Sequence, residues 1–112
     1  MLELSFCPTG WGCIYYIGII RVLQEKISYD YTKHHVKIIC SSSGVFASLI
    51  FLLNYENIEL LYFSLLEKYG KNTFGKGNQI VRDIFEKIVP KDIDINRLSD
   101  KLYINYCTIE GF

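Results

Sequence analysis

Residues 36–53, "VKIICSSSGVFASLIFLL", constrain the fold more than any other stretch of this sequence. An apolar run ends in three serines and a glycine, and a second apolar run follows at once. Neither flank has the composition of a loop. We interpret 36–40 as a strand and 44–53 as a helix that is buried on most sides. The second run is less than half of the ~20 residues that a membrane-spanning helix needs, which favours a core helix.

The segments before this stretch complete a strand-helix-strand unit. Residues 2–6, "LELSF", predict a strand because turn-forming residues follow them. Apolar residues recur at helical spacing over 14–26, so this segment is expected to be a helix. Gly18 lies inside it, and we expect a close backbone contact there. Such crossovers between parallel strands are almost always right-handed.

The segments after it predict two more helices and one more strand. Residues 58–70 have a helical pattern with glycine at the end. An apolar stripe from Ile80 to Ile88 marks an amphipathic helix that Pro90 ends. On its polar side, Asp83 and Lys87 are spaced for an i,i+4 ion pair. Residues 101–109 predict a third strand. The chain is therefore expected to be one α/β domain, 1–112, with a mainly parallel sheet.

Charge and cysteine content exclude several classes of function. The 112 residues carry 12 basic and 12 acidic side chains without a basic stripe, so no nucleic-acid partner is expected. The four cysteines form no CxxC pair, and His34-His35 stand in a polar connection without further ligands, so no metal site is expected. The start "MLELSFCPTG" does not read as a secretory signal. We expect an intracellular protein, cytoplasmic or peripheral to membranes, and not a transmembrane one.

The serines can be explained by a nucleophile elbow. In this strand-to-helix turn, the residues two before and two after the nucleophile must be small, because strand and helix nearly touch. Gly44 lies two residues after Ser42, which selects Ser42 among the three serines. Cys40 stands at the other support position, where glycine is usual. The alternative is that "SSSG" is only a turn with a serine N-cap on the helix.

Longer segments resemble the patatin-like phospholipases. "LSFCPTGWGCIYYIGIIRVLQE" and "KIICSSSGVFASLIFLL" are similar to the family's first strand, glycine-rich loop, glycine-containing helix, second strand and G-x-S-x-G elbow. "FEKIVPKDIDINRL" and "KLYINYCT" resemble the helix, connector and strand that follow. The glycine-rich loop corresponds to residues 8–13, the helix glycine to Gly18 and the elbow to residues 40–44. The resemblance covers essentially the whole chain.

This resemblance implies a three-layer α/β/α patatin-like fold, incomplete at the C-terminus, with residues 1–112 as a partial domain. It also implies a lipid acyl hydrolase with a Ser-Asp dyad and neither metal nor cofactor. Ser42 would attack the ester carbonyl of a lipid or phospholipid, with membrane-surface contact possible. Backbone N–H groups of Thr9, Gly10 and Trp11 would form the oxyanion hole. Trp11 either faces lipid or packs on the first helix.

The sequence departs from the family pattern at several positions. Pro8 has no N–H to donate, and Gly12 stands where the family has arginine. No aspartate here is followed by glycine, so the D-G-G or D-G-A aspartate of the dyad is not in this chain. The chain is either a fragment or a shortened relative, and on its own it is expected to be inactive.

Two other functions compete with hydrolysis. The first is a catalytically dead patatin-like remnant that binds lipid or a protein partner. The missing aspartate separates this alternative from the enzyme. The second is a plain βαβ nucleotide-binding unit, which is disfavoured because "CPTGWGC" is neither G-x-G-x-x-G nor a P-loop with its lysine.

Overall fold

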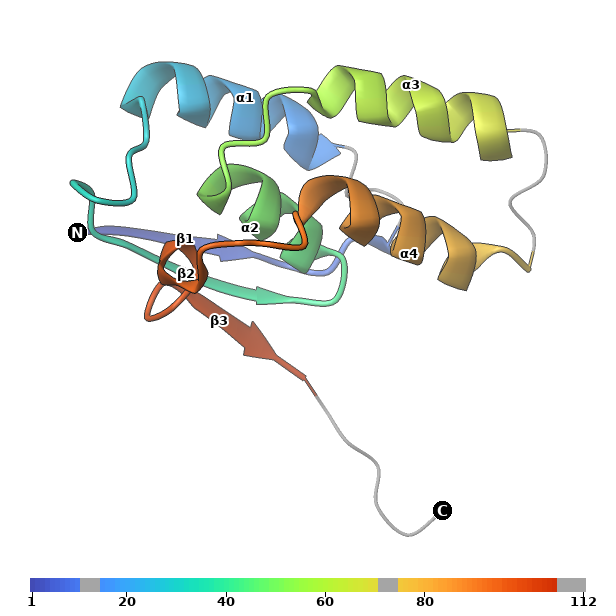
Figure 1. Cartoon of the computed structure of the whole chain (residues 1–112). Coiled ribbons are helices and arrows are strands. Elements are labelled where there is room, and N and C mark those ends of the chain that lie inside the picture. Colours follow the sequence, from blue (N-terminus) through green and yellow to red (C-terminus); the bar gives the residue numbers. More distant parts are fainter. Residues whose placement is uncertain (11–14, 71–74, 107–112) are drawn as a thin grey trace, which may run out of the picture.

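The computed structural model describes residues 1–10, 15–70 and 75–106. Within them, one helix connects the first two strands, and three α-helices with a short 3₁₀ helix connect the second strand to the third (Figure 1). The elements are β1 (Leu2–Phe6), α1 (Tyr15–Ile27), β2 (Val36–Ser41), α2 (Gly44–Leu52), α3 (Ile58–Tyr69), α4 (Gly77–Ile88), the short 3₁₀ helix η2 (Ile95–Arg97) and β3 (Leu102–Asn105). The α/β class and the order of elements are as predicted.

The sheet has the strand order β1-β2-β3, and both pairings are parallel. Leu2 pairs with Val36 at one end of the β1–β2 ladder, and Ile38 pairs with Leu102 where β3 joins. Side chains alternate between the two faces: Val36 and Ile38 are buried, whereas the side chain of Ile39 is 39% exposed. The parallel sheet is confirmed.

All four α-helices of the described part lie on the same face of the sheet (Figure 1). The strand order runs in one direction, and right-handed crossovers then place every connecting helix on one side. The described residues therefore form two layers, and the predicted three-layer arrangement is not seen among them. On the opposite face, the side chains of Ile39 and Tyr103 are 39% and 45% exposed.

Helix α2 is the centre of the core. It packs on β1 and β2 and contacts α1 and α4, and seven of its nine residues are buried. Phe51 is fully buried, and its ring stacks on Tyr29 at 4.9 Å between centroids. The expectation of a helix buried on most sides is confirmed, and this burial holds the N-terminus of α2 against the sheet.

Two local predictions are wrong. Gly18 is exposed, and a Cβ atom there would meet nothing within 4 Å, so no close contact explains this glycine. Asp83 forms an ion pair with Lys68 of α3 at 2.8 Å, in place of the predicted pair with Lys87. The third strand is found as β3, which ends at Asn105, whereas 107–109 lie outside the described residues.

Candidate functional site

Ser42 lies in the bend between β2 and α2. Its φ of +50° is left-handed, a conformation that costs a non-glycine residue roughly 1–2 kcal/mol. The backbone N–H of Val45 donates to the Ser42 carbonyl at 3.1 Å, which closes the turn. The side chain is exposed at the carboxyl end of β2. Ser42 is therefore an accessible hydroxyl on a strained turn, as the elbow interpretation requires.

Gly44 allows the start of α2 to approach β1. A Cβ atom at this position would lie 2.2 Å from the carbonyl oxygen of Phe6, far below van der Waals contact. Any larger residue would force helix and strand apart. The packing of α2 on β1 therefore requires the small residue that the sequence predicts two positions after Ser42.

Cys40, the other predicted support residue, is buried, with 2% of its surface exposed. Its Sγ lies 3.8 Å from the carbonyl oxygen of Tyr103 on β3. The Cys40 side chain therefore lies against the neighbouring strand β3.

Ser43 connects the bend to the loop after β1. Its Oγ accepts a hydrogen bond from the backbone N–H of Thr9 at 2.9 Å, and the two hydroxyl oxygens are 3.5 Å apart. Ser43 is the N-cap residue of α2, but its side chain makes no capping hydrogen bond. The capping bond that the simple-turn alternative requires is absent, because this hydroxyl binds the loop.

The loop after β1 lies beside the bend. Gly10 has a φ of +57°, which glycine adopts at little cost. Tyr16 of α1 donates from its hydroxyl to the Cys7 carbonyl oxygen at 2.8 Å and packs edge-on against Phe6. Of the three residues predicted for the oxyanion hole, Thr9 uses its N–H in the bond to Ser43. The role of Gly10 stays a prediction, and Trp11 lies outside the described residues.

Three acids and bases of the described part have hydrogen-bond partners other than Ser42. The Nδ1 atom of His34 accepts from the backbone N–H of Asp30 at 2.9 Å. Hydrogen bonds from Thr32 hold the pKa of the Asp30 carboxyl below its ordinary value. Hydrogen bonds from Lys68 and then Tyr69 lower the pKa of Asp83. None of these three side chains is bonded to Ser42.

Two further features are absent from the described ranges. No three or more His, Cys, Asp and Glu side chains cluster there in a way that could hold a metal ion. In the same ranges, no helix is long and apolar enough to cross a membrane.

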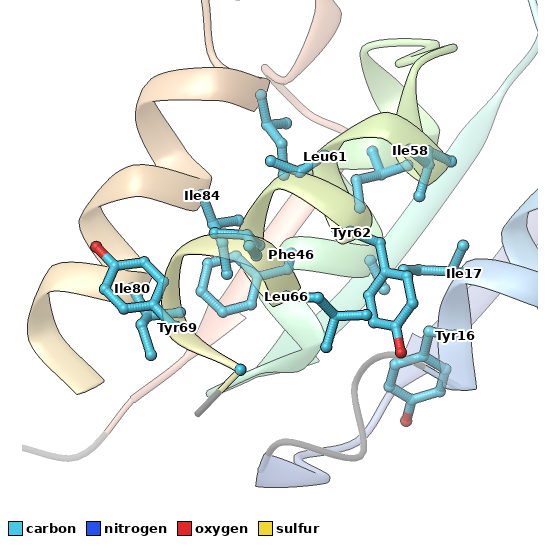
Figure 2. A pocket seen from close by; sticks show the side chains of 15 residues that line it. Tyr16, Ile17, Phe46, Ile58, Leu61, Tyr62, Leu66, Tyr69, Ile80 and Ile84 are labelled. Atoms are coloured by element: carbon cyan, nitrogen blue, oxygen red, sulfur yellow. The ribbon is translucent and has the colours of Figure 1, made fainter. Parts of the chain in front are cut away.

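A cavity of about 320 Å³ lies among α1, α2, α3 and α4 (Figure 2). Its walls include Ile17 of α1, Phe46 of α2, Leu65 of α3 and Ile84 of α4. Phe46 is one helical turn beyond Ser42, so α2 contributes to both the bend and the cavity. This cavity cannot be predicted from the sequence, because each helix supplies only a few wall residues, whose apolar pattern is also that of an ordinary core.

Compared with protein-family models, with curated proteins and with solved structures, the chain gives no match. The likeness to patatin-like phospholipases therefore depends on the motifs quoted above.

Proposed function

We propose that this chain is the nucleophile-bearing part of a patatin-like lipid acyl hydrolase, with Ser42 as the nucleophile. One observation carries the proposal: Ser42 is exposed in a left-handed bend, where Gly44 lets α2 approach the Phe6 carbonyl. A left-handed φ also occurs at Ser28, Asn54 and Asp100, so what distinguishes Ser42 is its place in the bend between the buried strand β2 and the buried helix α2.

The chemistry follows from the surroundings of Ser42. Its Oγ attacks the ester carbonyl, the hydroxyl proton passes to a base, and the carbonyl oxygen becomes an oxyanion. When the oxyanion collapses, the ester C–O bond breaks and the alcohol leaves with the proton from the base. Water then hydrolyses the acyl-enzyme and frees the serine. The first turn of α2 lies next to Ser42, and the positive end of a helix favours this developing charge. The loop with Gly10 is tied to the same bend through Thr9 and Ser43 and supplies further N–H donors. The base is the aspartate that the resemblance places outside the given sequence.

The apolar cavity supports a lipid rather than a polar ester as the substrate class. Phe46, four positions after Ser42 in the sequence, is one of its wall residues, and the lining consists mainly of aliphatic and aromatic side chains. A polar substrate would gain nothing from such a surface, whereas an acyl chain is stabilised by leaving water.

Acylation of the isolated chain tests the proposal. After incubation with p-nitrophenyl butyrate, peptide mass spectrometry measures the butyryl group on Ser41, Ser42 and Ser43. Oxyanion stabilisation and positioning can accelerate acyl transfer even without a complete dyad. We expect the butyryl group to appear on Ser42 at least about tenfold faster than on Ser41 or Ser43. The Ser42→Ala variant should show only the slow acylation of Ser41 and Ser43. Equal acylation of the three serines would contradict the proposal.

The non-catalytic alternative is favoured by one observation. Within the described residues, the hydrogen bonds of His34, Asp30 and Asp83 all go to groups other than Ser42. A remnant of this kind would bind lipid without acylation, and the same experiment separates the two functions.

A further inference from the structure

A cavity with apolar walls lies among the four helices, and polar contacts connect these walls on the outside. Arg21 of α1 pairs with Glu59 of α3, and Lys68 of α3 pairs with Asp83 of α4. The ring of Phe46, which lines the cavity, packs on that of Phe85 at 5.0 Å between centroids. The helices are thus connected around a space that is partly open to solvent.

The lining is almost entirely aliphatic and aromatic. Its polar groups are mainly the tyrosine hydroxyls, and two of them already have partners. Tyr69 donates to Asp83 at 2.5 Å and Tyr16 to the Cys7 carbonyl oxygen at 2.8 Å. In Figure 2 the rings of Tyr16 and Tyr62 lie toward the same side of the cavity, whereas the Tyr69 hydroxyl points away from it. A ligand with polar groups along its length would leave them unpaired among these side chains.

The volume of the cavity limits how many carbon atoms of a bound chain can lie inside it. An engineered apolar cavity of roughly 150 Å³ binds benzene, which has six carbons. At that ratio, the 320 Å³ of this cavity holds a chain of about twelve carbons. This is room for one alkyl chain and not for a whole diacyl lipid.

We propose that this cavity binds one unbranched alkyl chain of an amphiphile, with about twelve carbons inside and the polar end at Tyr16 and Tyr62. Such a chain has no hydrogen-bonding groups to satisfy, and it can follow the irregular space between four helices. The proposal deepens the proposed function, on which it rests for the choice of an acyl chain as occupant. Binding needs no reaction at Ser42, so a failure to bind and a failure of Ser42 to be acylated are separate results.

Calorimetric titration with the straight-chain carboxylates from octanoate to hexadecanoate, below their micelle concentrations, tests the proposal. Each added methylene that leaves water should tighten Kd roughly fourfold. We expect the affinity to rise with chain length up to about twelve carbons and then to stay constant, with one carboxylate bound per protein molecule. Binding that is undetectable, or that is independent of chain length, would overturn the proposal.

A matched pair of variants on α3 locates the ligand. Leu65 lines the cavity, and Leu65→Trp fills part of it. Leu60 is 68% exposed on the same helix, and Leu60→Trp adds the same bulk outside. We expect Leu65→Trp to weaken dodecanoate binding at least about tenfold and to move the plateau to shorter chains, with no change for Leu60→Trp. Equal effects of both variants would place the chain elsewhere and refute the site. If Leu65→Trp does not fold, the chain-length series on the unchanged protein still decides.

Discussion

The Cα of Gly44 faces the carbonyl oxygen of Phe6 so closely that a Cβ atom would lie 2.2 Å from that oxygen. We therefore expect Gly44→Ala to push α2 away from β1 and to lower the free energy of unfolding by about 1–3 kcal/mol. Urea denaturation measures the loss.

Gly18→Ala is the control for this substitution. Gly18 lies inside α1 with open space around it, so alanine there should raise the free energy of unfolding by up to about 1 kcal/mol. If Gly44→Ala and Gly18→Ala changed the free energy of unfolding in the same direction, the close approach of Gly44 to Phe6 would not explain why position 44 needs glycine.

Ser43→Ala should loosen the loop after β1. It removes the acceptor of the Thr9 N–H, and one lost hydrogen bond of this kind lowers the free energy of unfolding by about 1 kcal/mol. Hydrogen exchange at the Thr9 amide should become faster in this variant. Ser41→Ala, two residues before Ser43 at the end of β2, is the comparison and should leave that amide unchanged.

Ser42→Gly should stabilise the protein while it removes the nucleophile. The left-handed φ of +50° at position 42 strains serine but not glycine, so we expect Ser42→Gly to raise the free energy of unfolding by about 1 kcal/mol. Urea denaturation of Ser42→Gly and Ser42→Ala separates the backbone effect from the loss of the hydroxyl. A Ser42→Gly variant less stable than Ser42→Ala would argue against strain at the bend.

Asp83 should make stability depend on pH in the acid range. Hydrogen bonds from Lys68 and Tyr69 lower its pKa in the folded protein below the ordinary value of 3.8. The carboxylate therefore stabilises the fold fully above that value, and this contribution is lost as the pH falls through the lower, folded-state pKa.

Thermal unfolding from pH 2 to pH 7 tests this dependence. Asp83→Asn should have a lower Tm than the unchanged protein at pH 7, and the gap should narrow below about pH 4. Asp92→Asn, in the exposed connector after α4, is the matched control and should show no such pattern. A gap for Asp83→Asn that stays constant with pH would contradict the role of its charge.

The features that the sequence predicted are those encoded within short segments. The strand at 36–40, the buried helix from Gly44 and the bend between them all depend on neighbouring residues, and the structure has these elements in the predicted places. The role of Ser42 as nucleophile stays a prediction. Local periodicity and turn chemistry are sufficient for such elements.

The features that the sequence did not predict depend on contacts between distant segments. Ser43 and Thr9 are 34 positions apart, and no local pattern connects them. Asp83 pairs with Lys68, since the packing of α4 on α3 offers a closer partner than Lys87. The single helix layer follows from a strand order that only the assembled sheet reveals.

Reaction with a fluorophosphonate, followed by peptide mapping, tests the central claim most directly, because this probe adds covalently to an activated serine. The account predicts a phosphonyl adduct on Ser42, formed faster than any adduct on Ser41 or Ser43 and absent from Ser42→Ala. Labelling of the unchanged protein and of Ser42→Ala at the same rate would contradict it.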